Sequence, residues 1–523
     1  MPMTCLPSLD FSRLRAPSED CGVLIEPAAA TWAAAARANA ERLRTADVQL
    51  GGTTLADWRR RTRLAIVGAD DALVIVTGHQ PGFIHPGVWA KHVVATRFAR
   101  AVGGVAVNLV VDCDAIRRPS IAVPGLEGER LVLRRIRFAD APADSAYEQL
   151  PLLTGAQMAC FERSCRDALG ERYAGSQMPT FFRALRMATR ARDWVDQVVT
   201  ARSAVERTFG VVQDDRRVSG IWCNALVLDV LFNAQRFADC YNRALSVYRK
   251  SNRIRGAGRP IPDLERNRDR CETALWAYHP SGPRRRLVVG RRGNSLHLFA
   301  GESEIGVVDV CGSFSSEDLA AGLASLNGWQ LRPRALMLTI WARLLLADLF
   351  IHGIGGAKYD RISDAIIADY FGITAPRMVC ASATLHMGLP AAGTTAHDVR
   401  RLRTELRDLR YNPQRHLERT TETAPLIDRR ADAVRRSGEL RQRSGRDRAA
   451  RRKVFAEIRE INAALLASRP ESMSAKRDEL ASALQELRDT EISLYREYFF
   501  GLYDSHRLEC LSQALPSRGA FGV

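Results

Sequence analysis

The sequence predicts an α/β protein with a parallel sheet, a mainly helical insertion and a helical C-terminal third. Residues 72–77 (ALVIVT) and 105–111 (VAVNLVV) are short, continuous apolar runs, as is typical of strands buried on both faces. Between them come a glycine-rich turn, 78–87, and a helix-like stretch, 88–102. Strand, turn, helix and strand in this order form a βαβ unit, whose two strands lie parallel in one sheet.

The segments on either side of this unit predict further elements. Residues 28–63 are rich in alanine and arginine and favour helices. Residues 143–248 have a mostly helical pattern. Residues 285–300 indicate a hairpin in which 287–289 pairs with 296–299 across a glycine-containing turn.

The last two fifths of the chain are predicted to be mainly helical. We expect a helix over 334–349, a glycine-rich turn over 350–360 and a helix over 361–371. Beyond these, apolar residues recur at spacings of three and four, and X-Pro steps at 412–413 and 469–470 interrupt the pattern. This spacing predicts an antiparallel helical hairpin or a coiled coil.

These patterns divide the chain into six expected parts. They are an N-terminal helical segment (1–70), the first half of the sheet core (71–125), an inserted, mainly helical subdomain with a β-hairpin (126–330), the second half of the core (331–395), the helical hairpin or coiled coil (396–500) and a C-terminal tail (501–523). A chain of 523 residues is long enough for several such units.

Cysteine spacing and hydropathy argue against several classes of protein. No two of the 11 cysteines have C-x-x-C spacing, and the N-terminus lacks the basic and apolar regions of a secretory signal. The longest apolar candidate, 335–351, contains Arg343 and Asp348, so no membrane span is predicted. We therefore expect a cytoplasmic protein with reduced thiols and no bound metal.

The net charge of +17 raises the question of nucleic-acid binding. We discount that function because only five of the 76 basic residues are lysine, a skew typical of a GC-rich coding sequence. Part of the excess lies in residues 396–470, which contain 20 basic and 11 acidic residues. A solvated face of paired helices explains this segment better than a nucleic-acid groove does.

The turn after the first predicted strand is the first candidate site. Its ligand-binding candidates are Gly78, Gln80, Gly82 and the following Lys91, and its catalytic candidates are His79 and His85. A helix N-terminus presents free N–H groups and a partial positive charge, and glycines let an anion approach the backbone. Two imidazoles and an ammonium group can stabilise a developing negative charge. In the alternative interpretation, the glycines shape a plain turn and the histidines cap the helix.

Two further segments add candidates. Asp112 and Asp114 follow the second strand, where they can act as a base or hold an amine, a ribose or Mg²⁺, or alternatively cap a helix. The third segment contributes the ligand-binding candidates Gly353, Gly355, Gly356 and Lys358. It predicts a second anion-binding turn or, alternatively, a tight turn that needs positive φ. It lacks the Walker A order, but a nucleotide remains a candidate cofactor.

Three motifs together resemble the bacillithiol-biosynthesis cysteine-adding enzymes. Residues 76–82 (VTGHQPG) are similar to the family's T/S-G-Q-Q-x-G stretch, residues 111–114 (VDCD) to its Glu-Asp-His-Asp segment, and residues 331–359 to its L-R-P…G-G-P-G-E region. The resemblance implies a Rossmann-like core related to class I aminoacyl-tRNA synthetases, and a coiled coil that forms a homodimer. It also implies a ligase reaction that joins cysteine to the amine of glucosaminyl malate.

The sequence departs from this family at the site itself. His79 stands in place of glutamine, Cys113 in place of histidine, and Lys358 ends a stretch from which the family's glutamate is missing. We therefore expect a ligase-like enzyme that acts on small molecules, an amino acid and an amine such as an amino-sugar conjugate. Two alternatives stay open. One is a nucleotide-binding or nucleotidyl-transferring protein with the same core, and the other is a non-catalytic dimeric scaffold with a basic coiled coil.

Overall fold

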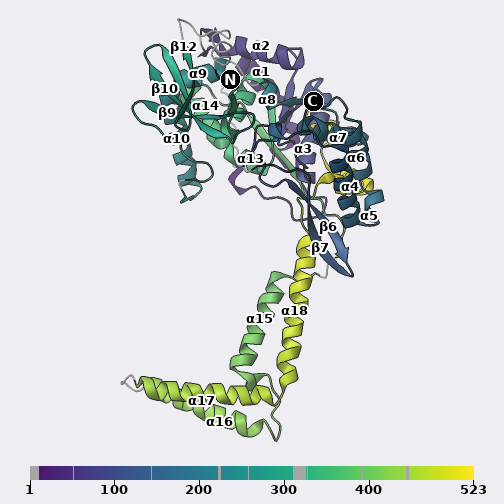
Figure 1. Ribbon diagram of the computed structural model, residues 1–523, viewed down its shortest axis with the longest axis vertical. Helices are drawn as coiled ribbons and strands as arrows, with labels where there is room; N and C mark the ends of the chain where they lie inside the picture. The colour runs from purple at the N-terminus through teal and green to yellow at the C-terminus, as the bar shows by residue number, and fades with distance from the viewer. Residues whose placement is uncertain are drawn as a thin grey trace. The chain divides into compact units, whose positions relative to one another are not determined.

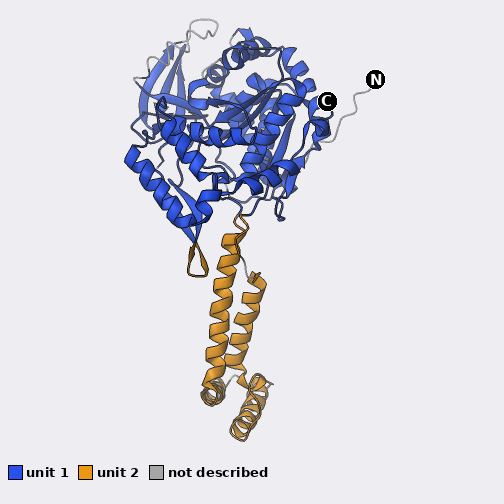
Figure 2. Cartoon of the chain, turned by 90° about the vertical axis from the view of Figure 1, so that its right-hand side faces the viewer, with its two compact units in different colours: residues 1–125, 133–386, 496–523 blue, residues 126–132, 387–495 orange. Residues whose placement is uncertain are grey.

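The computed structural model describes residues 11–523 except 51, 143, 222–224, 257, 310–325, 327, 391–392 and 443–446. Two compact units divide the chain (Figure 2). The larger unit comprises residues 1–125, 133–386 and 496–523, and the smaller unit comprises 126–132 and 387–495. All three candidate segments belong to the larger unit.

A six-stranded sheet forms the centre of the larger unit. Its strands lie in the order β1 (Val23–Glu26), β15 (Met378–Ala383), β14 (Leu349–His352), β4 (Val74–His79), β5 (Val105–Val110) and β8 (Asp214–Arg217). All neighbours pair in parallel except the edge strand β1. The predicted α/β class with a parallel sheet is thus confirmed. Strands are added in one direction from β4 through β5 to β8, and in the other from β4 through β14 to β15.

The predicted βαβ unit is present as β4, α3 (Pro86–Val102) and β5. The parallel register extends from Val74 opposite Val105 to His79 opposite Val110. The first strand therefore ends at His79, two residues later than the apolar pattern indicates. Gly78 continues the strand because it has no Cβ, which would lie 3.3 Å from the Cβ and the carbonyl oxygen of Leu109.

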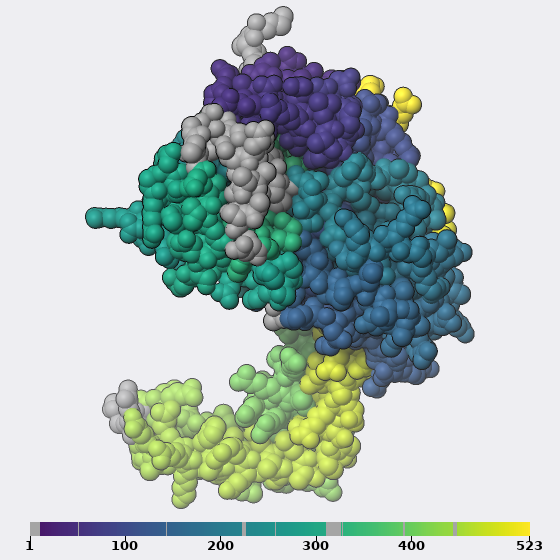
Figure 3. All heavy atoms as spheres, turned by 45° about the horizontal axis from the view of Figure 1, so that its top comes forward, coloured from purple at the N-terminus to yellow at the C-terminus, as the bar shows by residue number. Residues whose placement is uncertain are grey.

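The N-terminal residues of the larger unit form two helices, α1 (Trp32–Arg44) and α2 (Leu55–Val67). The short strands β2 (Gln49–Leu50) and β3 (Thr53–Thr54) separate them. These N-terminal residues, purple in Figure 3, make up one outer face of the unit. The last helix, α19 (Ser505–Ala514), also belongs to this unit. No helix among the described residues is both long and apolar enough to cross a membrane.

The region predicted as an insertion contains helices, a second sheet and one strand of the central sheet, β8. Its helices are α4 (Gly155–Leu169), α5 (Arg172–Gly175), α6 (Met178–Met187), α7 (Trp194–Thr208), α8 (Val218–Ile221), α9 (Ala225–Phe232) and α10 (Ala234–Ser251). A separate hairpin pairs β6 (Ser120–Glu127) with β7 (Arg130–Arg137).

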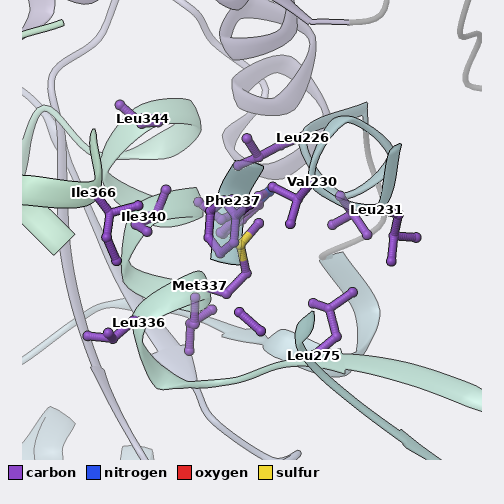
Figure 4. Close-up of a cluster of buried hydrophobic side chains, with 14 of the residues drawn as sticks. Leu226, Val230, Leu231, Phe237, Leu275, Leu336, Met337, Ile340, Leu344 and Ile366 are labelled. Atoms are coloured by element: carbon purple, nitrogen blue, oxygen red, sulfur yellow. The ribbon is translucent and has the colours of Figure 1, made fainter. Parts of the chain in front are cut away.

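The second sheet contains the predicted hairpin. Its order is β12 (Ser303–Asp309), β11 (Ser295–Ala300), β10 (Arg285–Arg292), β9 (Arg270–Tyr278) and β13 (Gln330–Pro333). Strands β10 and β11 pair antiparallel, with Val288 opposite Phe299, and Gly293 takes a φ of +59° in the turn. The hairpin prediction is confirmed. A large buried apolar cluster joins this sheet to the helices, and Figure 4 shows Phe237 among Val230, Met337 and Ile340.

The prediction of a helix and a turn over residues 334–360 is wrong in part. Helix α12 (Ala335–Trp341) continues as a π-helical segment, η4 (Ala342–Leu346), and strand β14 then begins at Leu349. The expected turn is instead the end of β14, Gly353, and the short helix α13 (Ile354–Tyr359). The reason is tertiary pairing, because β14 lies between β4 and β15 and its residues are buried. Helix α14 (Arg361–Phe371) follows as predicted.

The smaller unit contains the helices of the C-terminal third. They are α15 (Ala396–Tyr411), α16 (Ala424–Gln442), α17 (Arg448–Ala467) and α18 (Pro470–Ser493). Figure 1 shows α15 beside α18 and α16 beside α17. Both pairs run antiparallel, because residue numbers rise along one helix as their partners' numbers fall along the other. Beside α18, Thr394 bonds Glu486 and Glu405 bonds Lys476. Beside α17, Arg430 bonds Asn462 and Arg436 bonds Glu457. The predicted hairpin therefore consists of two antiparallel helix pairs.

Candidate functional site

A cavity of about 500 Å³ opens at the carboxyl ends of β4 and β14. These are the neighbouring strands from which the sheet is extended in opposite directions. Ligands of open α/β sheets bind in the crevice at such a point, and a cavity of this size suits a small molecule. Its wall includes Gly78, His79, Gln80, His85, Lys91, Asp114, Thr339, His352, Gly353, Gly355, Gly356, Ser382, Arg496 and Glu497.

Nine of the twelve candidate residues from the sequence lie in this wall. They are Gly78, His79, Gln80, His85, Lys91, Asp114, Gly353, Gly355 and Gly356. Three segments that are far apart in the chain thus meet at one cavity. Gly82, Asp112 and Lys358 are not in the wall. Gly82 lies beside Tyr147, whose hydroxyl oxygen is 3.4 Å from the position of a Cβ, and Lys358 is in the last turn of α13.

Asp112, just after β5, is fully buried and hydrogen-bonds the last residue of β8 and the short helix α8 that follows it. Its Oδ2 accepts a hydrogen bond from Arg217 Nε at 2.7 Å, and its Oδ1 accepts one from the Ser219 amide at 3.0 Å. Burial raises the pKa of this carboxyl. The neighbouring thiol of Cys113 is also buried, and burial raises its pKa, which argues against a reactive thiolate. Both side chains are therefore buried in the protein interior, and neither lines the cavity.

The start of α3 has its N–H groups already bonded. Pro86 has none, Gly87 donates to His85 Nδ1 at 3.1 Å, and the amides of Val88 and Trp89 donate to the His85 carbonyl. The expected free N–H groups for an anion are therefore absent at this helix. The alternative interpretation, in which a histidine caps the helix, describes His85 correctly.

Gly87 brings α3 against β15 and Arg496. A Cβ at this position would lie 2.8 Å from the carbonyl oxygen of Ala383 and 2.9 Å from Arg496 Nη2. Contacts this short would force the backbone of β15 or the guanidinium group of Arg496 to move. The glycine is therefore required by the close approach of two segments, and its amide is already occupied by the His85 cap.

Two cations line the cavity without an ion-pair partner among the described residues. Lys91 is only 3% exposed and donates to the Gly78 carbonyl at 2.9 Å. Burial lowers its pKa to about 8. Arg496 donates from Nη2 to the Ala383 carbonyl at 3.0 Å, its Nε is buried with no hydrogen-bond partner, and burial lowers its pKa. Glu497, also in the wall, acts on Arg496 electrostatically without forming an ion pair with it. The wall thus contains two cations that no ion pair within the described residues neutralises.

The two histidines of the turn are neutral at physiological pH. Burial lowers the pKa of His79 well below its usual value, and Lys91 lowers it further. Burial and then Arg496 lower the pKa of His85 to about 3. Hydrogen bonding assigns the tautomers, because His85 Nδ1 accepts from Gly87 while His79 Nδ1 lies 3.2 Å from the Gln80 carbonyl oxygen. His85 therefore has its proton on Nε2, and His79 has its proton on Nδ1.

Asp114 supplies a carboxylate to the same wall and is held by three donors. Gln80 Nε2 donates to Oδ2 at 2.7 Å, and the Ala115 amide and Arg284 Nη1 donate to Oδ1 at 2.8 Å and 3.2 Å. The side chain is 39% exposed. Gln80 therefore orients Asp114, and the cavity has an acidic position in addition to its cations.

Sequence reasoning missed Arg496, Thr339 and Ser382 as wall residues. Arg496 lies within the predicted helical region 396–500 and is one of 71 arginines in the chain, so its charge gave no signal. Ser382 lies in β15, which was not predicted as a strand. His352 belonged to the third motif but was not selected.

Comparison with known proteins gives no further assignment. No protein-family model matches the chain, and no curated protein matches it. Within the described part of the chain, no three His, Cys, Asp or Glu side chains are grouped as a metal site requires.

Proposed function

We propose that the chain is a ligase-like enzyme that joins an amino acid, such as cysteine, to a small amine in this cavity. The observation that supports the proposal most is the pair of cations, Lys91 and Arg496, which form no ion pair with any described residue. A buried charge is costly unless a partner neutralises it. An anionic group of a bound substrate, a carboxylate or a phosphate, fits as that partner.

The other wall residues fit the remaining needs of amide formation. The amine nitrogen attacks the activated carbonyl carbon, negative charge develops on the carbonyl oxygen, and the activating group leaves as the amine loses a proton. Lys91, Arg496 and His85 Nε2–H are donors that stabilise such charge. Asp114 fits a role in binding the amine. We name a nucleoside triphosphate as co-substrate, because its cleavage converts the acid's oxygen into a leaving group.

The strand order supports a Rossmann-like core, as the bacillithiol-family resemblance implies. Numbered along the chain, the parallel strands have the order 5-4-1-2-3. Read from the opposite edge, this matches the first five positions of the order 3-2-1-4-5-6 of dinucleotide-binding sheets. This same order favours the second candidate function, nucleotide binding or nucleotidyl transfer without amide formation. In both functions the nucleotide phosphates are held by side chains, since the α3 amides are already bonded.

Isothermal titration calorimetry tests the proposal with ATP, cysteine and glucosaminyl malate, singly and in combination, followed by mass spectrometry of the products. We expect the wild type to bind ATP and to form an amide, and Lys91→Met with Arg496→Met to lose binding of the anionic ligands. The matched control is Arg137→Met, an arginine that is 71% exposed.

The outcomes separate the two functions. ATP binding that depends on Lys91, without an amide product from any amino acid and amine pair, favours nucleotide binding or transfer. Binding that is equal in the wild type and the double variant contradicts the assignment of the anion site and, with it, both functions at this cavity.

A further inference from the structure

His352 ends strand β14 and lies in the cavity wall, where it is 6% exposed. Its Nε2 is 3.0 Å from Asp360 Oδ2. Its ring packs against Phe350, with the ring centroids 4.3 Å apart. The ring is thus fixed both by a carboxylate and by an aromatic neighbour.

Asp360 is itself fixed as a carboxylate. Arg343 Nη1 donates to its Oδ2 at 2.7 Å, and the Thr339 hydroxyl donates to its Oδ1 at 2.5 Å. The guanidinium of Arg343 holds the pKa of this buried carboxyl well below its usual range. An ionised carboxylate only accepts hydrogen bonds, so the His352 proton is on Nε2 and the lone pair of the neutral ring is on Nδ1.

The Nδ1 atom of His352 faces Gly356 and has no hydrogen bond to any described residue. A Cβ on Gly356 would lie 2.7 Å from Nδ1. The neighbouring Gly355 is also in the cavity wall, and a Cβ there would meet nothing within 4 Å. Because residue 356 is a glycine, no Cβ lies against this lone pair.

We propose that His352 is the general base of this site and that Asp360 is its positioning residue. The inference rests on the proposed function for its substrate, an amine. As the amine nitrogen forms its bond to the activated carbonyl carbon, its N–H proton moves to His352 Nδ1. The resulting imidazolium is stabilised by Asp360 and returns the proton to the departing phosphate oxygen.

The other two histidines fit this role less well. His85 uses its Nδ1 lone pair to cap α3, and Lys91 next to His79 disfavours a positive charge on that ring. The charged groups recorded around His352 are Asp360, at its Nε2, and Arg343, which bonds that carboxylate. Lys91 approaches the adjoining Gly353, with Cδ 3.9 Å from the position of a Cβ. Of the three histidines in the cavity wall, His352 is the one that combines a free ring nitrogen with a carboxylate that stabilises its protonated form.

The variants Gly356→Ala and Gly155→Ala test the inference without removing the imidazole. Gly356 lies in the first turn of α13 and Gly155 in the first turn of α4, and neither has a positive φ, so alanine suits the backbone at each position. A Cβ at Gly155 would meet nothing within 4 Å, and Gly155 is not in the cavity wall. We expect Gly356→Ala to lose at least 100-fold in kcat with substrate binding within twofold, and Gly155→Ala to keep wild-type turnover. A pH–rate profile should lose its acidic limb in His352→Gln.

A second measurement does not depend on turnover. Diethyl pyrocarbonate acylates a free imidazole nitrogen, and mass spectrometry locates the product. We expect acylation of His352 at equal rates in the wild type and Gly155→Ala, and at least tenfold more slowly in Gly356→Ala. Equal rates in all three proteins overturn the inference, even if no amide product is found. Slow acylation in Gly356→Ala alone, without any amide product, supports the base and rejects the ligase function.

Discussion

Lys91 differs from most buried cations of this protein in having no acidic partner among the described residues. Arg343 is paired with Asp360 and Asp364, Arg202 with Glu206 and Asp215, and Arg59 with Asp348. The buried Arg430 also has no ion pair, but it donates three hydrogen bonds to amide and carbonyl oxygens. Lys91 donates to one carbonyl oxygen. A buried charge without a counter-charge costs stability, so we infer that Lys91 is retained for a ligand.

Replacing Lys91 with methionine should therefore stabilise the fold while it abolishes anion binding. Lowering the lysine pKa from 10.5 to about 8 corresponds to about 3 kcal/mol at pH 7, and loss of the hydrogen bond to the Gly78 carbonyl costs about 1 kcal/mol. We expect a net gain of about 2 kcal/mol in urea unfolding at pH 7 and a smaller gain above pH 8, where Lys91 loses its charge. A variant that is destabilised at pH 7 contradicts the unpaired-charge argument.

His85 should make the protein sensitive to acid. Burial lowers its pKa in the folded protein to about 3 from the usual 6.5, so between these pH values the unfolded chain binds more protons and stability falls as pH decreases. The slope from one such group is at most about 1.4 kcal/mol per pH unit. We expect His85→Asn, whose amide oxygen can still cap α3, to reduce this slope in urea unfolding between pH 4 and 6.5. The exposed His397→Asn is the control and should leave the slope unchanged.

At the scale of elements, prediction succeeded where local signals agree and failed where tertiary pairing decides. Helix α3 has Pro86 at its start and Gly103 with a φ of +66° at its end, and its predicted bounds were accurate to two residues. Residues 350–360 contain a similar number of glycines, but β14 is made by its pairing with β4 and β15. Strand β14 has four residues, all of them buried, so it shows no alternation of apolar and polar residues that could identify it as a strand.

Asp348 connects three of these elements and should be essential for stability. It is 1% exposed and accepts hydrogen bonds from Arg59 and Arg63 of α2 and, at 2.7 Å, from the Val74 amide at the start of β4. Asp348→Asn leaves two buried arginines without a counter-charge, so we expect a loss of about 3–5 kcal/mol in urea unfolding.

The matched control for this change is Asp140→Asn. Asp140 forms an ion pair with Arg137 in which the two side chains are 81% and 71% exposed, so its loss should be below about 1 kcal/mol. Similar losses in both variants would show that the buried cluster adds no more stability than a solvated ion pair.

For the whole molecule, the sequence predicted the α/β class, the central βαβ unit and nine residues of one cavity wall. It did so because glycine, histidine and acidic residues are concentrated at the ends of recognisable strands, as at 78–87 and 112–114. Arg496 could not be predicted, since contact with the cavity follows from folding over hundreds of residues. Asp112 was expected at the site but is bonded elsewhere. The sequence near Asp112 could not show that β8 lies beside β5 and supplies Arg217 as its partner.

The oligomeric state is a property of the whole molecule, and substitutions in the smaller unit can test it. Helices α16 and α17 expose Val434 (44%) and Phe455 (56%), although their other apolar residues, such as Ile461 and Leu465, are buried between them. We expect the wild type to sediment as a dimer of the 58.0 kDa chain and Phe455→Glu to sediment as a monomer. Met187→Glu, which alters a 73% exposed side chain of α6, should stay dimeric. A wild-type monomer at every concentration excludes the dimer, and an unchanged dimer in Phe455→Glu excludes this face as its interface.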